Sequence, residues 1–395
     1  MFPHTNLRVA LVHYWFVNHG GGERVVEALG EMFPQADLFA LVAEPASLTP
    51  NLRKHRLRTS FLQQIPFGRR WYRHLLPLYP FALEQLDLSE YDLVISSESG
   101  PAKGVITSAR TLHLCYCHSP MRYLWDNYHE YRRGIGVRSF AFAPVAHYLR
   151  LWDYASAARV DAFVANSANV ANRIRKHYRR DATVIHPPVS LAEDPLREPS
   201  GDYYLVVSRL VEYKRIDLAI EACNRLGRKL RIVGTGDRYK ALKRAAGSSV
   251  EFLGRLEDHE IREQYRNCRA FLFPGEEDFG ITPVEAQSHG RPVIAYGCGG
   301  VLETVNGIDV WETPDGAATG VFFREQSCDA LCGAMLAFER WESRFLAENI
   351  RGSVQRFSPL IFKERMMQYV SRNWEEFSLN RAERALSPPP EVMPQ

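Results

Sequence analysis

The stretch FLFPGEEDFGITPVEAQSHG, residues 271–290, joins a short apolar run, an acidic loop and a helix signal. The apolar run ends at Pro274. Thr282 is a favoured N-cap, Pro283 suits the first helical position, and Glu285 stands third. Thr282 and Glu285 therefore match a capping box. The stretch predicts a strand, a loop and a helix that begins near Thr282, which is one unit of an α/β sheet.

The same helix start offers a site for an anion. The backbone N–H groups of Gly280, Ile281 and Thr282 lie at a helix N-terminus, where a diphosphate would fit. Glu277 stands just before this site and Glu285 just inside it. One carboxylate could then contact a sugar and the other a ribose. A capping box alone explains Glu285, but it leaves the acidic GEEDFG loop without a role.

Strand and helix signals alternate along the rest of the chain. Strands are expected at 7–15, 36–42, 91–99, 111–118, 161–168 and 182–189, and again at 203–210, 229–236, 249–256, 269–275 and 291–297. Segments long enough for helices separate them, as in parallel sheets covered on both faces. The sequence predicts two doubly wound, Rossmann-like α/β domains whose carboxyl strand ends face each other across a cleft.

A polar segment at 190–202, rich in Pro, Gly and acid, marks the expected domain boundary. The domains are expected at 1–190 and 191–359. A helix at 360–378 is expected to pack back on the N-terminal domain, and residues 379–395 are expected to be a disordered tail.

Composition narrows the class of protein. The chain has 395 residues, 46% hydrophobic and 24% charged, which is typical of soluble globular proteins. It contains no run of eighteen apolar residues and no secretion-signal pattern, so a cytoplasmic protein is expected. Seven scattered cysteines indicate reduced thiols, and a net charge of +3 does not indicate nucleic-acid binding.

Two cations follow the first strand expected in the second domain, in VVSRLVEYKR. Arg209 and Lys214 could neutralise a diphosphate leaving group at the carboxyl end of that strand. Surface cations at a helix start would oppose the helix dipole, so a bound anion explains them better.

Two glycine turns are weaker signals. Gly234 and Gly236 follow the strand KLRIV, and Gly20, Gly21 and Gly22 follow the first strand of the chain. Such glycines allow close backbone approach to a sugar or a phosphate, but they also serve any tight turn between a strand and a helix.

His118 ends the strand TLHLCYC. A single histidine is more often structural than catalytic, but the carboxyl end of a strand favours a functional role. Cys115 and Cys117 stand beside it, yet no second ligand cluster accompanies them, so no metal is expected.

Residues 51–79 are basic and aromatic, and Asp and Glu are absent from Pro45 to Leu83. Basic residues among aromatics suit the surface of an anionic membrane. The alternative is a solvated basic face over an ordinary core helix.

These motifs together resemble family 4 of the retaining glycosyltransferases, which have the GT-B fold. Glu277 and Glu285 match the E-x7-E motif of that family, and the resemblance extends over roughly residues 7–377. It implies that Glu277 faces the donor sugar and that Glu285 binds ribose hydroxyls. It also implies that Arg209 and Lys214 hold the donor phosphates in place of a metal ion.

The resemblance assigns further donor contacts. It places the Gly234–Gly236 turn near the nucleotide, Arg255 near the base, and His118 against the donor. The N-terminal domain would then hold the acceptor, and the C-terminal domain the nucleotide sugar. No cofactor beyond this donor substrate is expected.

Two segments narrow the resemblance. CHSPMRYLWDNYHEY (117–131) and FPGEEDFGITPVEAQ (273–287) are similar to the mannosyltransferases of bacterial O-antigen and exopolysaccharide assembly. This implies GDP-mannose as donor and a polyprenyl-diphosphate-linked glycan as acceptor. Residues 51–79 would then contact the inner face of the plasma membrane, where that acceptor is held.

Other functions stay open at this stage. The donor could be a UDP-sugar. Two Rossmann-like domains also permit a dinucleotide oxidoreductase, although neither glycine turn completes G-x-G-x-x-G, since Val25 and Tyr239 occupy the last position. A carbohydrate-binding protein without activity is the third possibility.

Overall fold

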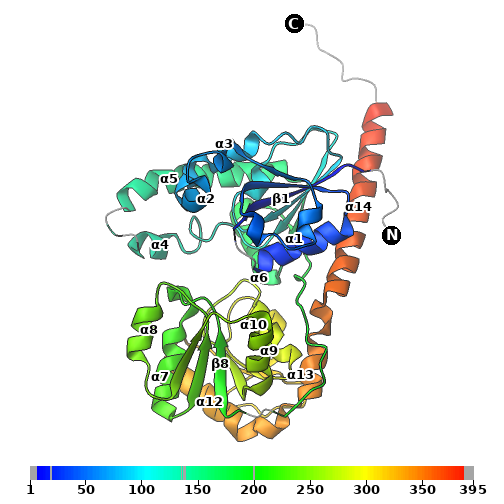
Figure 1. The fold of residues 1–395 in the computed structure, drawn as a ribbon. Helices are drawn as coiled ribbons and strands as arrows, with labels where there is room; N and C mark the ends of the chain where they lie inside the picture. Colours follow the sequence, from blue (N-terminus) through cyan, green and yellow to red (C-terminus); the bar gives the residue numbers. More distant parts are fainter. Residues whose placement is uncertain (1–6, 18–19, 135, 137–138, 199–200, 387–395) are drawn as a thin grey trace. The chain divides into compact units, whose positions relative to one another are not determined.

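The chain forms two compact units, each built on one parallel sheet (Figure 1). The computed structural model describes residues 7–17, 20–134, 136, 139–198 and 201–386. The first unit contains the chain up to Asn166, Val170–Pro187, and the chain from Leu360 onward. The second unit contains Ser167–Asn169 and Pro188–Pro359.

The sheet of the first unit has seven strands among the described residues, in the order β3-β2-β1-β4-β5-β6-β7. Every neighbouring pair is parallel. The strands are β1 (Val9–Phe16), β2 (Asp37–Ala43), β3 (Leu57–Thr59), β4 (Leu93–Glu98), β5 (Leu112–Cys117), β6 (Ala162–Ala165) and β7 (Ala182–Val184). The order reverses between β1 and β4, which makes the carboxyl ends of these two strands the switch point of the sheet.

Helices cover both faces of this sheet. They are α1 (Gly21–Met32), α2 (Gly68–Trp71), α3 (Tyr79–Glu84), α4 (Tyr128–Gly134), α5 (Ser139–Ser156), α6 (Ala168–Tyr178) and α14 (Pro359–Leu386), with the 3₁₀ turns η4 (Tyr72–Leu78) and η5 (Ala102–Gly104). One core cluster joins Leu11 of β1 to Leu29 of α1. A second joins Val12 of β1 to Leu83 of α3 and Leu149 of α5. Alternate residues of each strand therefore serve opposite cores.

The long helix α14 packs on the first unit. One face of α14 is buried in the core cluster that includes α1. Its residues there are Phe362, Met366, Tyr369 and Val370. The Tyr369 hydroxyl donates to the Phe163 carbonyl at 3.1 Å. Because α14 continues to Leu386, residues 379–386 are helical and not part of a disordered tail. Residues 387–395 lie outside the described residues.

The sheet of the second unit also has seven parallel strands in the described part, in the order β10-β9-β8-β11-β12-β14-β13. They are β8 (Tyr203–Val207), β9 (Lys229–Val233), β10 (Val250–Gly254), β11 (Ala270–Phe273), β12 (Val293–Tyr296), β13 (Gly307–Asp309) and β14 (Gly320–Phe323). Its switch point lies between β8 and β11.

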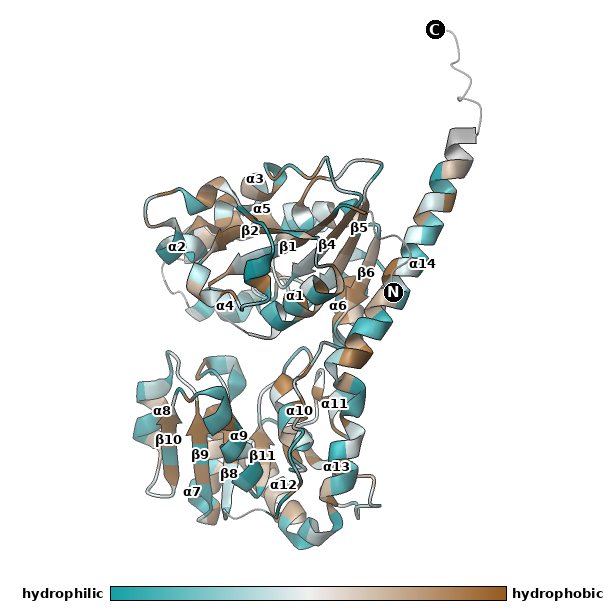
Figure 2. Ribbon diagram, turned by 45° about the vertical axis from the view of Figure 1, so that its right-hand side comes forward, coloured by the Kyte–Doolittle hydropathy of each residue, from teal (hydrophilic) through white to brown (hydrophobic). Residues whose placement is uncertain are grey.

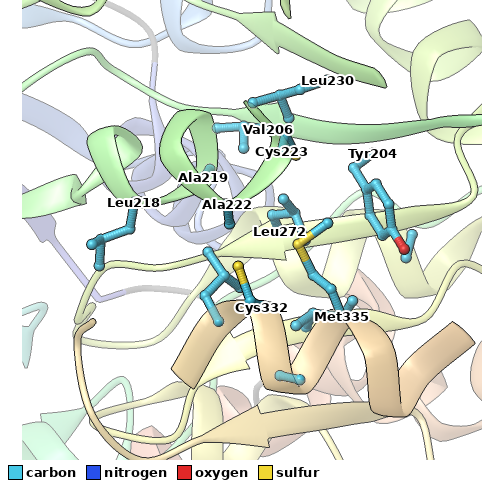
Figure 3. Close-up of a cluster of buried hydrophobic side chains, with 14 of the residues drawn as sticks. Tyr204, Val206, Leu218, Ala219, Ala222, Cys223, Leu230, Leu272, Cys332 and Met335 are labelled. Atoms are coloured by element: carbon cyan, nitrogen blue, oxygen red, sulfur yellow. The ribbon is translucent and has the colours of Figure 1, made fainter. Parts of the chain in front are cut away.

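The helices of the second unit are α7 (Ile216–Leu226), α8 (Tyr239–Ala245), α9 (Asp258–Asn267), α10 (Ile281–Ser288), α11 (Val301–Thr304), α12 (Cys328–Trp341) and α13 (Ala347–Ser353), with the 3₁₀ turn η8 (Glu212–Lys214). Figure 3 shows the core beneath α7 and α12. Cys223 of α7, Met335 of α12 and Leu272 of β11 belong to one buried cluster there. This packing holds the sheet rigid behind the loops at its carboxyl edge.

The predicted fold class is confirmed: the chain contains two Rossmann-like α/β sheets. Figure 2 shows mostly hydrophobic strands and mixed helices, which is why the strands could be predicted from apolar runs. Every predicted strand is present. Three further strands, β3, β13 and β14, were not predicted.

Candidate functional site

The loop from β11 to α10 lies at the switch point of the second sheet. Helix α10 begins at Ile281, and Gly280 is its N-cap with φ of +92° and no side-chain cap. The predicted capping box of Thr282 and Glu285 is therefore wrong, because the helix starts one residue before Thr282. Pro283 occupies the third helical position and has no N–H. The amides of Gly280, Ile281 and Thr282 lie at the N-terminal, positive end of the helix dipole, where Gly280 is buried and the other two residues are partly exposed.

Glu277 lies in the same loop and forms an ion pair with Lys214 of η8. The two side chains are 21% and 15% exposed, so the pair is half-buried. Gly275 permits this contact, because a Cβ there would lie 2.9 Å from the Lys214 Cα. Sequence reasoning brought both residues to one site, and the structure joins them directly across β8 and β11.

Two glycines after β12 support this acidic loop. The Gly300 N–H donates to the Glu277 carbonyl at 2.9 Å, and Gly299 forms a β-bridge with Glu277. A Cβ on Gly299 would lie 2.5 Å from the Glu277 oxygen, and one on Gly300 would lie 2.3 Å from the Asp278 oxygen. Only glycine allows so close an approach of two backbones.

Arg209 is exposed in the loop after β8. Its guanidinium donates to the Tyr213 hydroxyl at 2.7 Å, and the Lys214 ammonium lies 5.3 Å from the centre of the Tyr213 ring. Tyr213 therefore holds the two cations on one side of the loop. Arg209 is thus an exposed positive charge beside Lys214, whose own charge is paired with Glu277. Cations and a helix N-terminus both favour a bound anion.

The Gly234–Gly236 turn packs against this loop. A Cβ on Gly234, whose φ is +133°, would lie 1.9 Å from the Ser208 oxygen, and one on Gly236 would lie 2.4 Å from the Leu210 oxygen. Close packing thus accounts for both glycines, and their proposed contact with the donor stays a prediction. The Gly234 N–H also donates to the Gly254 carbonyl at 2.7 Å, which brings the end of β10 and exposed Arg255 beside the turn.

Glu285, on α10, is held by a tyrosine. The Tyr265 hydroxyl of α9 donates to Glu285 Oε2 at 3.1 Å, and Tyr265 is 2% exposed. The His289 ring stacks on Tyr265, with ring centres 5.7 Å apart. Burial, together with nearby arginine charges, lowers the pKa of His289 to about 4, so this ring is neutral at pH 7.

The first unit places its glycine run at the switch point of its own sheet. Gly20 is the N-cap of α1, and Gly21 and Gly22 form its first turn. The Gly20 N–H donates to Glu23 Oε2 at 3.0 Å. Glu23 is 6% exposed and lies 3.9 Å from Nε2 of His13. Burial acts to raise the pKa of Glu23, but the interactions with His13, with the backbone and with His118 together lower it.

His118 lies beside this glycine turn. Its Nε2 is 2.9 Å from the Ser97 hydroxyl, and a Cβ on Gly22 would lie 3.6 Å from the same nitrogen. Burial, and then the charge of His13, lower the pKa of His118 to about 3, so the ring is a neutral imidazole at pH 7. The structure thus brings together Gly22 and His118, which are far apart in the sequence.

A buried charge cluster supports the carboxyl ends of β4 and β5. The Lys103 ammonium contacts the Asp153 carboxylate and lies 3.4 Å from Glu98, and all three side chains are fully buried. Burial raises the pKa of Glu98 to about 7, against the opposing charge of Lys103. The Glu98 carbonyl accepts the His118 N–H at 2.6 Å, so this cluster fixes the backbone on which His118 stands.

Among the residues that the structure describes, no group of three or more His, Cys, Asp or Glu side chains could hold a metal ion. The described cysteines are all free thiols.

Two family models match adjoining parts of the chain. Glycosyltransferase Family 4 matches residues 19–193, and Glycosyl transferases group 1 matches residues 192–341. The chain belongs to glycosyltransferase family 4. Human alpha-1,3/1,6-mannosyltransferase ALG2 is 25% identical over 326 residues, which are 72% of this chain and 74% of ALG2. The uncharacterized glycosyltransferase MJ1178 of Methanocaldococcus jannaschii is 28% identical over 150 residues, 37% of this chain and 42% of MJ1178.

The family 4 chain also shares its fold with solved structures. The crystal structure of Anabaena HepE in complex with UDP and glucose superposes with a TM-score of 0.65 at 16% identity, covering 93% of this chain and 100% of HepE. At that identity the likeness shows the fold, which is the predicted GT-B fold. The match to MJ1178 spans less than half of that relative.

Sequence reasoning missed several residues that hold the candidate site of this family 4 protein. They are His13, Glu23, Ser97, Lys103, Tyr213, Tyr265, Gly299 and Gly300. The glycine pair after β12 was a visible signal, because adjacent glycines at the end of a parallel strand predict a close backbone approach. The others depend on which elements pack together, and no local pattern reveals that.

Proposed function

We propose that this protein is a retaining glycosyltransferase that moves a hexose from a nucleotide sugar to a lipid-linked glycan acceptor in cell-surface polysaccharide assembly. We further propose that the donor is GDP-mannose. The observation that carries the proposal is the cluster at the β8/β11 switch point. There Lys214 pairs with Glu277, Arg209 lies nearby on Tyr213, and α10 begins with uncapped amides.

The donor diphosphate would bind this cluster. Arg209 and Lys214 supply two positive charges, and the amides of Gly280, Ile281 and Thr282 supply donors. When the bond between the anomeric carbon and the diphosphate oxygen breaks, negative charge grows on the leaving group. The two cations would stabilise that charge as it develops, which is the role that a metal ion could otherwise play. A hydroxyl of the acceptor then attacks the face that the nucleotide leaves, which gives retention.

The two glutamates would bind hydroxyls on either side of the diphosphate. Glu277, already oriented by Lys214, would accept hydrogen bonds from the donor sugar. Glu285, held by Tyr265, would bind the ribose hydroxyls. Gly234, Gly236 and Arg255 would line the side toward the base.

The first unit would contribute two features. Gly20, Gly21 and Gly22 lack side chains and would allow close backbone approach. Neutral His118 has a ring that can hydrogen-bond a sugar hydroxyl.

The similarity to human ALG2 supports mannose as the transferred sugar, because ALG2 is a mannosyltransferase that aligns with 72% of this chain. A UDP-sugar is the alternative, because the HepE structure of the same fold holds UDP and glucose. The residues named above would contact phosphates and ribose, which both donor classes share. These residues therefore do not distinguish GDP-mannose from a UDP-sugar.

A panel of nucleotide sugars tests it. Binding is measured by calorimetry, and slow release of free nucleotide is measured for the same donors. We expect GDP-mannose to bind and to be hydrolysed, while UDP-glucose and other UDP-sugars are not. Selective turnover of a UDP-sugar would overturn the donor but keep the transferase. Absence of binding by every donor would contradict the transferase proposal itself.

The acceptor would be held at the inner face of the plasma membrane. Within the described residues, no helix is long and apolar enough to cross a membrane. Residues 51–79 instead expose Phe67 (74%) and Trp71 (54%) beside exposed Arg69 and Arg70. Other residues of this segment, such as Tyr72, are buried in the core. The segment therefore also packs on the core, as in the alternative of a basic face over a core helix. Exposed aromatics among cations favour an anionic bilayer surface.

Vesicle flotation tests the membrane contact. We expect the protein to float with anionic vesicles at low salt, and the double variant Phe67→Asp, Trp71→Asp to stay in solution. The matched control is Trp311→Asp in the second unit, because Trp311 is also 75% exposed. Equal flotation of the double variant and the control would contradict this contact.

A further inference from the structure

Two adjacent serines on β4 bind two histidines in the same way. The Ser96 hydroxyl lies 2.9 Å from Nε2 of His113, and the Ser97 hydroxyl lies 2.9 Å from Nε2 of His118. Ser96 is fully buried and Ser97 is 1% exposed. Neighbouring strand residues point to opposite faces of a sheet, so the two pairs are separate sites with the same chemistry.

The pairs differ at the second ring nitrogen. In His113, Nδ1 lies 3.3 Å from the Arg159 carbonyl, which can only accept. His113 therefore carries its proton on Nδ1, and Nε2 accepts from the Ser96 hydroxyl. In His118, the bond to Ser97 is the one side-chain hydrogen bond of the ring within the described part of the chain. Among the described residues, hydrogen-bond partners are present for both ring nitrogens of His113 and for Nε2 of His118.

The surroundings of Ser97 also differ from those of Ser96. The Ser97 carbonyl accepts the Nδ1–H of fully buried His13 at 3.1 Å, so both histidines of the switch point contact this one serine. Glu23 lies 3.9 Å from the other nitrogen of His13 and also binds the Gly20 N–H. Ser97 is thus the point where the glycine turn, His13 and His118 are tied together.

We propose that Ser97 is a positioning residue for the transfer reaction. Its hydroxyl donates to Nε2 of His118, which places the ring proton on Nδ1. The neutral ring then presents an N–H donor to a hydroxyl or ring oxygen of the sugar. This inference rests on the proposed function, because it assumes that a sugar lies against His118.

The test uses Ser97→Ala, with Ser96→Ala as its matched control. Each variant removes one buried hydroxyl from the same strand. We expect Ser97→Ala to lower kcat about tenfold with donor KM within about twofold, the loss typical of one hydrogen bond that orients a group. Ser96→Ala is expected to stay within about twofold of the wild type in both constants. Ser97→Thr keeps the hydroxyl and is expected to restore kcat.

A double variant separates positioning from loss of structure. On a His118→Gln background, Ser97→Ala is expected to lower kcat no further, because the group that it orients is already gone. An equal loss on both backgrounds would overturn the inference, and so would a Ser97→Ala enzyme that turns over like the Ser96→Ala enzyme. If the wild-type chain releases no nucleotide from any donor, the proposed function fails, and this inference fails with it.

Discussion

The switch points of the two sheets are built from opposite kinds of side chain. In the first unit, the residues between β1 and β4 are buried or partly buried, and His118 is held neutral by burial, with its pKa at about 3. In the second unit, the residues between β8 and β11 keep their charge, since Arg209 is exposed and Lys214 pairs with Glu277. The switch points at equivalent places in the two sheets thus carry side chains of different chemistry.

We propose a division of labour between the two units on the basis of this difference. A neutral imidazole and glycine backbone can orient sugar hydroxyls without attracting phosphate. Two cations and a helix N-terminus without a side-chain cap would attract a diphosphate group. We therefore expect variants of the second unit to affect donor binding and leaving-group departure, and variants of the first unit to affect turnover alone.

The largest effect is expected from the cations. Arg209→Ala or Lys214→Ala should lower kcat about 10²–10³-fold, because each removes a charge that stabilises the departing diphosphate. Steady-state release of nucleotide measures this. The control is Arg225→Ala, since Arg225 forms an exposed pair with Asp329 in the same unit. Near-wild-type turnover of Arg209→Ala would remove that residue from the site.

Glu277→Gln should have the next largest effect. It keeps the shape of the side chain but removes the charge that pairs with Lys214 and would accept sugar hydroxyls. A loss of about 10- to 100-fold in kcat/KM is expected, the size of a hydrogen bond to a charged group. Glu276→Gln is the control, because Glu276 is the neighbouring carboxylate in the same loop. Equal losses in both variants would mean that overall loop charge, and not Glu277, is what matters.

A pH series tests the neutral histidine of the first unit. The folded pKa of His118 is about 3, below the usual value of about 6.5, so the unfolded chain binds a proton in this window that the folded chain does not. Stability should therefore fall as pH drops from about 6.5 toward 3. In thermal melts, His118→Gln should show a shallower fall in Tm over the accessible part of that range. A fall as steep as that of the wild type would contradict a neutral His118 in the folded chain.

The smallest effect is expected at Thr282. Because Gly280 caps α10, Thr282→Ala should change the free energy of unfolding by well under 0.5 kcal/mol, roughly the lower limit for loss of a true N-cap. Chemical denaturation measures this. Loss of about 1 kcal/mol would restore the capping role that the sequence suggested.

The sequence predicted the fold further than the site. Apolar strands such as β1 and β2 were visible because buried parallel strands need nearly continuous apolar runs. Glu277, Lys214 and His118 were chosen as candidates because they follow strand ends, where ligands bind in such sheets, and their roles stay predictions. The N-cap of α10 was misplaced by two residues, because Thr282 and Glu285 satisfy a local rule while Gly280, with its positive φ, is the N-cap. Ser97 and Tyr265 were invisible, because their partners are fixed only by tertiary packing.

The most direct test of the division of labour is calorimetric binding of the preferred nucleotide sugar to three proteins. They are the wild type, Lys214→Ala and Ser97→Ala. We predict that Lys214→Ala raises Kd at least about tenfold, as expected for loss of a charge-assisted contact. Ser97→Ala should leave Kd within about twofold while its turnover falls. Unchanged donor affinity in Lys214→Ala, or a loss of affinity in Ser97→Ala of the same size, would contradict the account.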